Sequence, residues 1–437
     1  MNAAADHRAQ AAVIGLGKIG LPLAVQIARH RGGVIGVDIS SAVVESVNAG
    51  RSPVLGEPGL DDGLASAIAS GSMVATTDVH AAVASSSFVI VVVPLVVDES
   101  GNPLFAGIDA ATRAIAEGVR PGTTVIYETT LPVGTTRDRF GTLLEETSGL
   151  TVGTDLFVVH SPERVSSGTV FRDLARYPKL VGGTDSESSR RAVAFYESFL
   201  KFEDRPELER ANGVWELESC EAAELAKLAE TSYRDLNIAF ANQLARGAEA
   251  LGLDIGPVID ACNSQPYSHI HRPGIAVGGH CIPVYPHFLS RSVPQMTLSD
   301  VGREVNALAP ALAADRLYDE LGGLSGRSVV ILGLAYRGGV KEHAFSGTLS
   351  LVPALTSLGA RVTVMDPLYS DREIEAHGLD PHAAGSSVDA VVLQADHAQF
   401  QELGPGDFPG VQLVFDGRRA LDPGRWEPVR VVGPGFG

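Results

Sequence analysis

Short apolar runs alternate with amphipathic segments along the first half of the chain. Each apolar run has the length of a strand, and the segments between the runs carry apolar residues at helical spacing. The first two runs flank a glycine-rich turn and a helical segment. This alternation predicts an α/β fold with a doubly wound, mostly parallel sheet. The predicted strands are 11–14, 34–37, 88–93, 124–127 and 157–159, and the predicted helices include 21–29, 42–49 and 108–117.

A long helical pattern occupies the middle of the chain. Residues 216–251 contain no proline and a single interior glycine, Gly247, and their apolar positions recur at helical spacing. A helix of this length is about 50 Å long at 1.5 Å per residue. Such a helix is typical of a connection between domains or of a subunit interface. A stretch rich in loops and histidines follows at 263–286.

The alternation of strands and helices begins again near residue 328. We therefore predict two Rossmann-like doubly wound domains joined by a long central helix, with boundaries at 1–212, 213–315 and 316–437. The second set of elements comprises strands at 328–332, 361–365 and 390–393, a glycine-containing loop at 333–339 and a helix at 347–358.

Composition excludes several classes of protein. The 437 residues are 45% hydrophobic and 20% charged, as in globular proteins of two or three domains. The net charge of −18 argues against nucleic acid and anionic membranes as partners. The longest apolar run, 88–97, is about half the length of a membrane span and contains Pro94, and we find no signal-peptide pattern.

The cysteines add a further restriction. The chain has three, Cys220, Cys262 and Cys281, and their spacing matches neither a zinc site nor a disulfide framework. We therefore expect no metal site and a location in the reducing cytoplasm.

The glycine-rich turn has the pattern of a dinucleotide-binding loop. Its three glycines allow a tight turn, close approach of the backbone to a pyrophosphate and close packing of helix on sheet. Asp38 ends the second strand, where it is placed to accept hydrogen bonds from a ribose diol. No arginine follows Asp38, which favours NAD over NADP because the acid would repel a 2′-phosphate. The loop residues are Gly15, Gly17, Lys18, Ile19 and Gly20.

Four other side chains are candidates for chemistry. Cys281 lies in a glycine-flanked loop at 277–283, where a thiol can be exposed, although a free cysteine is more often a small buried hydrophobe. Lys227 could equally lie on a solvated helix face with Glu224 and Glu230 as partners. Glu163 follows a predicted strand end, but it could simply pair with Arg164 or cap a turn, and Thr130 has the same ambiguity.

Together these segments resemble the UDP-glucose/GDP-mannose dehydrogenase family, and most closely its branch acting on UDP-N-acetylhexosamines. The resemblance covers nearly the whole chain. It implies an N-terminal NAD-binding domain at 1–212, a central helical dimerisation domain at 213–315 and a C-terminal nucleotide-sugar-binding domain at 316–437. It also implies a homodimer with a nucleoside-diphosphate sugar as substrate. The matching stretches are 15–24, 57–60, 129–135, 161–165, 223–244, 277–283, 333–336 and 396–400.

The resemblance assigns roles to the four candidates. Typical members oxidise a primary alcohol to an aldehyde and then to a carboxylate. Cys281 matches the cysteine that attacks the aldehyde, so that a thiohemiacetal gives up the second hydride and water cleaves the thioester. Lys227 matches the lysine that stabilises oxyanions, while Glu163 and Thr130 match residues that organise water and protons.

The resemblance also implies two sets of contact residues. The expected cofactor contacts are Gly15, Gly17, Lys18, Ile19, Gly20, Asp38, Pro94 and Thr130. The expected substrate contacts are Glu163, Arg164, Lys227, Tyr267, Gly278, Gly279, Tyr336 and Arg337.

Two departures from the family concern the reaction. Four residues after the cysteine the family has an aspartate, and this chain has Tyr285. Four residues after the lysine the family usually has an asparagine, and this chain has Thr231. Losing one preorganised donor can cost about a hundredfold or more in rate, so these changes weaken the case for ordinary thioester hydrolysis.

Other departures concern binding. Tyr267 lies where relatives have an arginine that reaches the neighbouring subunit's sugar site. The loop after Gly333 has Arg337 for the family's lysine, Ala344 for its arginine and Gly347 for its proline. Losing fixed cations changes which ligand is held best, so we expect an unusual sugar nucleotide. On the cofactor side, the family's Pro-Thr-Pro is Pro94-Leu95-Val96.

Three functions remain open at this point. The leading one is an NAD-dependent dehydrogenase of a nucleoside-diphosphate sugar, and within it two oxidations to a uronate and a single oxidation to a carbonyl are equally favoured. The second is a single oxidation of a secondary alcohol, for example of a GDP-octose in lincosamide-type antibiotic biosynthesis, which needs no thioester and tolerates changes at 231 and 285. The third is an inactive nucleotide-binding protein, against which the joint retention of Cys281, Lys227, Glu163 and Thr130 argues.

Overall fold

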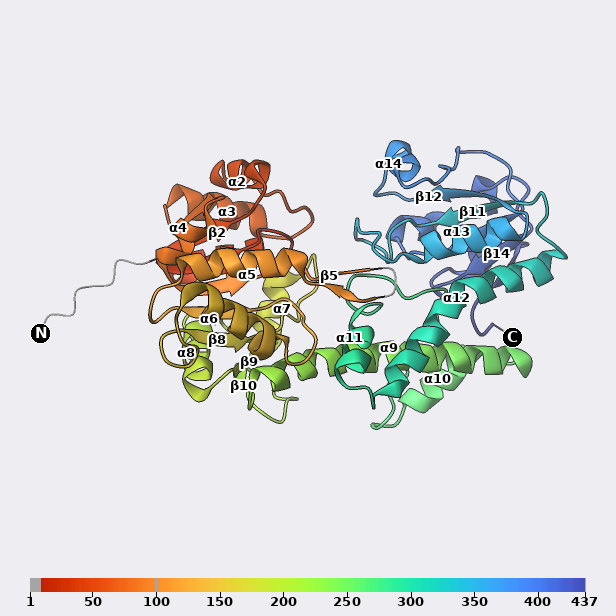
Figure 1. The fold of residues 1–437 in the computed structure, drawn as a ribbon. Helices are drawn as coiled ribbons and strands as arrows, with labels where there is room; N and C mark the ends of the chain where they lie inside the picture. Colours follow the sequence, from red (N-terminus) through yellow and green to blue (C-terminus); the bar gives the residue numbers. More distant parts are fainter. Residues whose placement is uncertain (1–8, 99–100, 437) are drawn as a thin grey trace, which may run out of the picture. The chain divides into compact units, whose positions relative to one another are not determined.

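The structure is a computed structural model that describes residues 9–98 and 101–436. It divides into two compact units, Met1–Ala229 and Glu230–Gly437 (Figure 1). Each unit contains one large β-sheet. The predicted pair of doubly wound domains is therefore confirmed.

The sheet of the first unit has eight strands among the described residues, in the order β10-β9-β8-β7-β4-β1-β2-β3. Neighbouring strands are parallel except for β8 and β9, which are antiparallel. The strands are β1 (Ala9–Ile14), β2 (Val34–Val37), β3 (Met73–Thr76), β4 (Ser86–Val91), β7 (Thr124–Tyr127), β8 (Phe157–His160), β9 (Lys179–Gly183) and β10 (Val214–Glu216). A separate antiparallel pair consists of β5 (Val96–Val97) and β6 (Pro103–Leu104).

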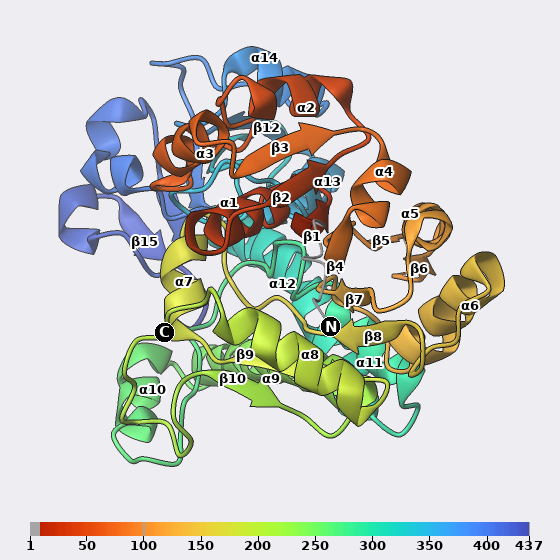
Figure 2. The same ribbon diagram turned by 90° about the vertical axis from the view of Figure 1, so that its left-hand side faces the viewer.

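Helices cover both faces of this sheet because its strands are apolar on both sides. Ala11 and Val13 of β1 pack with the helices of one face, and Ala12 and Ile14 pack with those of the other. The first face carries α1 (Gly20–His30), α3 (Leu60–Ala69), α7 (Val170–Arg176) and α8 (Ser186–Glu197), and α8 lies over β9 and β10 (Figure 2). The second face carries α4 (Val79–Ala84), α5 (Ala106–Gly118) and α6 (Thr142–Ser148). The remaining helical segments are α2 (Ser41–Asn48) and a π-helix, η1 (Thr135–Gly141), that leads into α6.

A helical region follows the first sheet. The long helix predicted at 216–251 is confirmed as α9 (Cys220–Ala250), although Glu216 belongs to β10. A second long helix, α12, was not predicted, because Pro310 interrupts its sequence pattern and its apolar residues do not gather on one side. Helix α12 spans Thr297–Leu321. The other helices of this region are α10 (Ile255–Asn263) and α11 (Tyr285–Ser292).

A chain of buried polar side chains ties α12 to α9. Asp235 of α9 has no exposed side-chain surface, and it accepts hydrogen bonds from Arg303 at 2.8 Å and from Asn306 at 2.8 Å. Asn242 extends the chain by donating to Asn306 at 2.9 Å. A buried charge of this kind is tolerated only with such partners.

The second sheet is parallel, with the order β12-β11-β13-β14-β15. Its residues on one face pack against α12, α13 and α14, and those on the other face pack against Phe400, Phe408 and Trp426. The elements are β11 (Ser328–Leu332), β12 (Arg361–Met365), β13 (Ala390–Leu393), β14 (Leu413–Asp416), β15 (Arg430–Val432), α13 (Gly347–Ser357), α14 (Asp371–Ala376) and the 3₁₀ turns η2 (Ala398–Glu402), η3 (Pro405–Asp407) and η4 (Pro423–Trp426).

The three-part division at 1–212, 213–315 and 316–437 stays a prediction. Across the described residues, the helices are too short or too polar to pass through a lipid bilayer.

We predict that Arg303→Met lowers the free energy of unfolding by about 3–5 kcal/mol, because it leaves the Asp235 carboxylate buried without its cation. The exposed pair of Arg190 and Glu187 is the control, and Arg190→Ala should cost less than about 1 kcal/mol. Urea denaturation followed by circular dichroism measures both variants. Equal destabilisation by the two substitutions would contradict the importance of the buried pair.

Candidate functional site

The glycine-rich turn between β1 and α1 has the shape of a phosphate-binding loop. Gly15 has a φ of +97°, and a Cβ atom there would lie 2.9 Å from the carbonyl oxygen of Val92. A Cβ atom on Gly20 would lie 1.9 Å from the carbonyl oxygen of Gly15. At Gly17, by contrast, a Cβ atom would meet nothing within 4 Å. Glycine is therefore required for packing at two positions and leaves the third open to a ligand.

Asp38 is anchored beside this loop. One carboxylate oxygen accepts a hydrogen bond from the backbone N–H of Leu16 at 3.0 Å, and the other accepts one from Ser40 at 2.9 Å. The carboxylate is only half-buried, so it keeps lone pairs for a ribose diol. Helix α1 has no side-chain cap at Ile19, so its N-terminal dipole faces no side-chain acceptor there and favours an anion. These residues fit the adenosine and pyrophosphate parts of a dinucleotide.

A second loop, after β7, carries Thr130. Thr130 is buried, and the hydroxyl of its neighbour Thr129 donates to the carbonyl oxygen of Val93 at 2.7 Å, next to the predicted contact Pro94. Glu224 of α9 holds the far end of this loop by accepting from the backbone N–H groups of Gly134 at 2.6 Å and Thr136 at 2.8 Å. Burial raises the pKa of Glu224 to about 7, despite hydrogen bonds from Thr136 and Gly134 that act in the opposite direction.

The alternative interpretation of Lys227 is wrong. A lysine on a solvated helix face would be exposed, but Lys227 is 7% exposed. Glu224, its expected partner along the helix, instead bonds the loop after β7. Lys227 is thus a largely buried side chain near the end of the first unit, which excludes the solvated helix face.

Glu163 is held as a carboxylate beyond the end of β8. One of its oxygens accepts from the backbone N–H groups of Arg164 at 2.6 Å and Val165 at 3.0 Å, so it does cap a turn. The other oxygen accepts from Lys179 at 3.0 Å. Burial acts to raise the pKa of Glu163, but Lys179 and the backbone N–H of Arg164 outweigh it and hold the pKa below its ordinary value. Arg164 itself donates to the carbonyl oxygen of Pro178 at 3.2 Å.

Cys281 is exposed, which excludes the interpretation of this residue as a buried hydrophobe. The loop that carries it packs against the loop after β11. A Cβ atom on Gly278 would lie 2.6 Å from Cβ of Tyr336, and Gly279, with a φ of +93°, donates its N–H to the carbonyl oxygen of Ala344 at 2.8 Å. Glycines are thus needed for the close approach that presents the thiol.

The two departures from the family that concern the reaction, Thr231 and Tyr285, lie on helices. Thr231 is buried on α9, one helical turn beyond Lys227 and on the same face of the helix. Tyr285 is the first residue of α11, where its ring lies 5.7 Å from that of Phe288, and its N–H donates to the carbonyl oxygen of Cys281 at 2.9 Å.

The predicted residues fall into two groups. Gly15, Gly17, Lys18, Ile19, Gly20, Asp38, Pro94, Thr130, Glu163, Arg164 and Lys227 lie in the first unit. Thr231, Tyr267, Gly278, Gly279, Cys281, Tyr285, Tyr336 and Arg337 lie in the second. Tyr267 is 92% exposed on the loop after α10, and Arg337 donates to the hydroxyl of Tyr336 at 3.1 Å. A single active site assembled from both groups remains a proposal.

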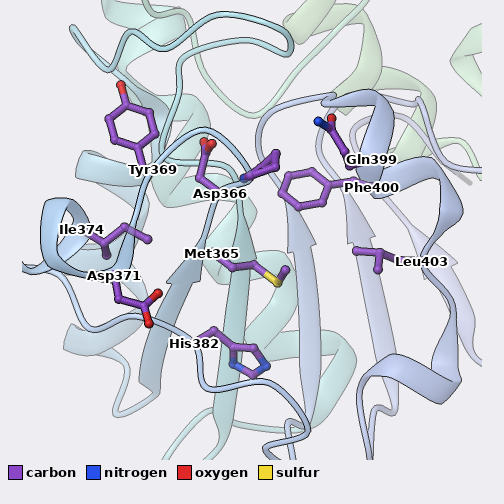
Figure 3. Close-up of a pocket in the computed structure, with 10 residues that line it drawn as sticks. Met365, Asp366, Tyr369, Asp371, Ile374, His382, Gln399, Phe400 and Leu403 are labelled. Carbon is purple, nitrogen blue, oxygen red and sulfur yellow. The ribbon is translucent and has the colours of Figure 1, made fainter.

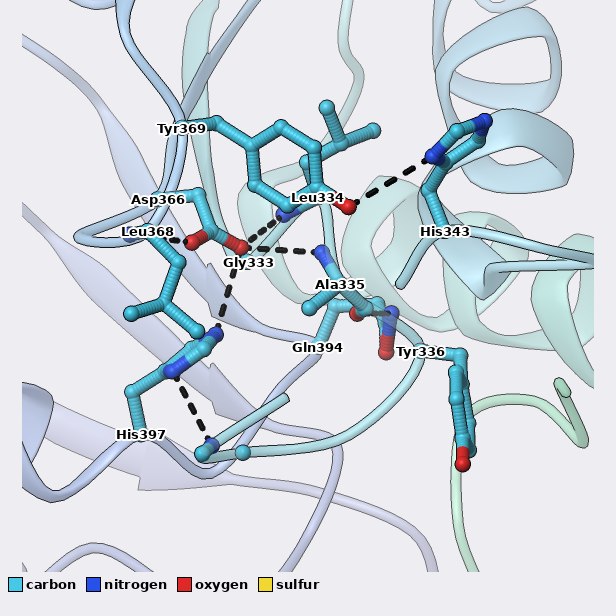
Figure 4. Close-up of polar contacts among 12 residues, drawn as sticks. Gly333, Leu334, Ala335, Tyr336, His343, Asp366, Leu368, Tyr369, Gln394 and His397 are labelled. Carbon is cyan, nitrogen blue, oxygen red and sulfur yellow. Dashed lines mark hydrogen bonds and ion pairs between the residues drawn. The ribbon is translucent and has the colours of Figure 1, made fainter. Parts of the chain in front are cut away.

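The loop after β11 repeats the architecture of the cofactor loop with one difference. Asp366 ends β12 and accepts from the backbone N–H groups of Leu334, Ala335 and Leu368, each at 2.8 Å (Figure 4). The side chain of His397 occupies the remaining side of this carboxylate at 3.2 Å. Among the described residues, Asp366 therefore has two more hydrogen-bond partners than Asp38, which is bonded by Leu16 and Ser40.

A cavity of about 280 Å³ lies at the carboxyl end of β12 (Figure 3). Met365, Tyr369, His382 and Phe400 are among its lining residues. None of the residues predicted for cofactor or substrate binding lines it.

Several residues were missed by the sequence analysis. Arg418 donates to the carbonyl oxygen of Tyr336 at 2.7 Å and to the side chain of Gln394 at 3.0 Å, so it supports the loop that carries the predicted substrate contacts. Its place directly after the end of β14 was the available signal. Lys179, the partner of Glu163, had no signal beyond its position in an apolar run. Across the part of the chain that the structure describes, no group of three or more acidic, histidine or cysteine side chains could hold a metal ion.

Comparison with known proteins identifies this arrangement. Profiles of the UDP-glucose/GDP-mannose dehydrogenase family match residues 9–200 as its NAD binding domain, 221–307 as its central domain and 330–423 as its UDP binding domain. The UDP-N-acetyl-D-mannosamine dehydrogenase of Pyrococcus horikoshii is 33% identical over 435 residues, which are 98% of each protein. The NDP-N-acetyl-D-galactosaminuronic acid dehydrogenase of Ralstonia nicotianae is 32% identical and covers 96% of this chain and 97% of its own.

Solved structures agree with the sequence comparison. The UDP-D-ManNAc dehydrogenase structure from Pyrococcus horikoshii has a TM-score of 0.86 at 30% identity and covers 98% of this chain and 99% of its own. A UDP-glucose dehydrogenase from Pyrobaculum islandicum has a TM-score of 0.86 at 26% identity over 100% of both chains. The chain therefore belongs to the UDP-glucose/GDP-mannose dehydrogenase family and is an NAD-dependent nucleotide-sugar dehydrogenase.

Proposed function

We propose that the enzyme oxidises a primary alcohol of a nucleoside-diphosphate sugar to a carboxylate in two steps, with Cys281 as the nucleophile. The observation that carries this proposal is the exposed Cys281 thiol on a loop whose glycines pack closely against Tyr336. A thiol presented in this way is needed only if the second oxidation proceeds through a covalent intermediate.

The cofactor fits the loop between β1 and α1. Gly15, Gly17 and Gly20 would hold its pyrophosphate at the N-terminus of α1, and Asp38 would bind the adenosine ribose. NAD, when bound, supplies the acceptor for the hydride that leaves the sugar carbon in each oxidation. Pro94 and Thr130, from the loops after β4 and β7, are the expected neighbours of its nicotinamide half.

The protein side chains move protons and hold oxygens. In the first step the sugar hydroxyl loses a proton as its carbon loses a hydride, and Glu163, held as a carboxylate, accepts that proton directly or through water. The thiol of Cys281 then adds to the aldehyde, and its proton passes to the new hydroxyl group. The thiohemiacetal carbon loses the second hydride while that hydroxyl group releases its proton to water, which gives a thioester. Water held by Glu163 and Thr130 cleaves the thioester, while Lys227 stabilises the oxyanions.

A single oxidation is the second candidate, and Tyr285 favours it. Where typical relatives have a carboxylate that assists the thiol, this chain has an aromatic ring that lies against Phe288. A secondary alcohol oxidised to a ketone needs neither a thioester nor hydrolytic water. Such a substrate would be an unusual sugar nucleotide, for example a GDP-octose.

The second unit supports the substrate class and a dimer. Tyr336 and Arg337 belong to the loop that Arg418 supports, and Gly278 and Gly279 pack against Tyr336; these four residues are the proposed contacts of the diphosphate sugar. The relatives that act on UDP-N-acetylmannosamine make that compound the first substrate to test. Residues of α9 and α12 form an exposed apolar set that we propose to be the homodimer interface, namely Tyr233, Phe240, Leu298, Val301 and Leu308. The free thiol of Cys281 favours a reducing compartment, so we propose a cytoplasmic location.

The ratio of NADH formed to sugar consumed tests the proposal. We expect two NADH per sugar and a carboxylic acid product when the enzyme and NAD are given UDP-, GDP- and dTDP-sugars, including N-acetylmannosamine and extended-chain ones. Absorbance and mass spectrometry measure both quantities. One NADH and a carbonyl product would establish the single oxidation instead, and no NADH with any sugar that binds would favour the inactive alternative.

Substitution of the nucleophile gives an independent test. Cys281→Ser should lower the rate of carboxylate formation by about a hundredfold or more, because the hydroxyl is a far weaker nucleophile at neutral pH. Cys262→Ser, at a half-buried cysteine on α10, is the matched control and should retain the wild-type rate. Full turnover by Cys281→Ser would refute the covalent route.

The choice of cofactor depends on Asp38. Asp38→Asn removes the charge that repels a 2′-phosphate and weakens the bond to the ribose diol, so the preference for NAD over NADP in kcat/KM should fall by about tenfold or more. Asp78→Asn changes an exposed helix-capping acid at the end of the next strand and should leave the preference intact. An unchanged preference in Asp38→Asn would remove Asp38 from the cofactor site.

A further inference from the structure

Lys179 of β9 is buried between two carboxyl groups. Its Nζ lies 3.0 Å from an oxygen of Glu163 and 3.1 Å from an oxygen of Glu128, the residue that follows β7. The exposed fractions of the side chains fall from 12% at Glu163 to 5% at Lys179 and 0% at Glu128. The three groups therefore form a cluster that extends from the proposed catalytic carboxylate into the interior of the protein.

The two carboxyl groups have unequal surroundings. Glu163 accepts hydrogen bonds on both oxygens, from Lys179 and from two backbone N–H groups. Glu128 receives Lys179 and the hydroxyl of Tyr196 on the same oxygen. Its other oxygen is buried without a hydrogen-bond partner among the described residues. A carboxylate oxygen left in this way is costly, whereas a protonated carboxyl group can donate from it.

The charges of the cluster also favour a proton on Glu128. Two carboxylates and one ammonium leave one negative charge in a buried site, and a single proton removes it. Burial raises the pKa of Glu128 to about 7, with a further increase from Glu163 that Lys179 and Tyr196 only partly offset. The neighbouring groups do not supply that proton. Burial and Lys179 lower the pKa of His160 to about 3, and burial raises the pKa of Tyr196 well above its ordinary value.

We propose that Lys179 and Glu128 are positioning residues for Glu163, in which Lys179 fixes the Glu163 carboxylate and Glu128 stores a proton received from it. This inference rests on the proposed function, because Glu163 must act as the base. Above its pKa of about 7 Glu128 is ionised, and the proton taken from the sugar hydroxyl then passes from Glu163 to Glu128, which restores the Glu163 carboxylate for the next step. The proton later returns through Glu163 to solvent, and no electron is exchanged within the cluster.

The dependence of kcat on pH is the first test. In the wild-type enzyme kcat should rise through an inflection near pH 7 as Glu128 becomes able to accept a proton. Glu128→Gln keeps the shape of the side chain and its acceptor oxygen but cannot take up a proton. We expect the pH profile of Glu128→Gln to have no inflection near pH 7 and its kcat above pH 7 to be about tenfold below wild type. The KM for the sugar and the melting temperature should stay close to wild type. An inflection that persists in Glu128→Gln would overturn the proposal.

Substitution of Lys179 gives a second test, in which the acid limb of the pH profile shifts. Lys179→Met removes the cation that lowers the pKa of Glu163, so the acid limb of the profile should move to higher pH. Lys179→Arg restores a cation and should move the acid limb back toward wild type, which a loss of folding would not do. Lys201→Met, at an exposed lysine of the same unit, is the control and should leave the profile unchanged. If the acid limb has the same midpoint pH in wild type, Lys179→Met, Lys179→Arg and Lys201→Met, the role of Lys179 is contradicted.

An infrared titration without substrate separates this inference from the proposed function. The C=O band of a protonated carboxyl group should disappear from the wild-type spectrum with a midpoint near pH 7 and be missing from Glu128→Gln. Glu224 titrates in the same range, so Glu224→Gln identifies its share of the band. If Glu128→Gln retains the full band, the stored proton is refuted whatever the activity. If the Glu128 band is present but no sugar nucleotide is oxidised, the proposed function fails and the proton-holding site stands.

Discussion

A carboxylate at the end of the second strand holds the loop after the first strand in both units, and the binding surfaces depend on this contact. Asp38 bonds the backbone N–H groups of Leu16 and Ser40, and Asp366 bonds the corresponding groups of Leu334 and Leu368. Backbone N–H groups at the carboxyl edge of a parallel sheet would otherwise be unsatisfied when water is displaced. The same interaction thus builds two loops of similar shape from different sequences.

The two loops differ in the exposure and in the further partners of this carboxylate. Asp38 is half-buried and keeps acceptor capacity for a ribose, and Gly17 leaves open space beside it. Asp366 is covered by His397, and Ala335 stands at the position that corresponds to Gly17. The Asp366 carboxylate therefore supports the C-terminal loop, and the proposed binding groups are the side chains that follow, Tyr336 and Arg337. One fold in this way serves a cofactor and a second nucleotide with different chemistry.

The sequence predicted the parts of the structure that depend on local pattern. The strands at 34–37, 124–127, 328–332, 361–365 and 390–393 were placed to the residue, because buried parallel strands are short and continuously apolar. The pattern could not predict α12, whose stability comes from contacts such as that of Arg303 with Asp235 rather than from an apolar stripe. The sequence pattern also could not predict which charged side chains are buried. Lys227 resembled a surface lysine until the structure placed it in the interior, and the link of Glu163 to Lys179 joins residues 16 apart in sequence across two strands.

The proposed function requires that a covalent intermediate forms on Cys281 and is hydrolysed with the help of Glu163. A peptide map by mass spectrometry of Glu163→Gln enzyme, quenched with acid after it has been given NAD and the sugar-nucleotide aldehyde, tests this step apart from the first oxidation, which also uses Glu163. Slowed hydrolysis should leave the oxidised sugar nucleotide attached to Cys281 as a thioester, because the thiol can still add to the aldehyde while its water is no longer activated. An unmodified Cys281 in enzyme that has formed NADH from the aldehyde would contradict a covalent intermediate on this cysteine.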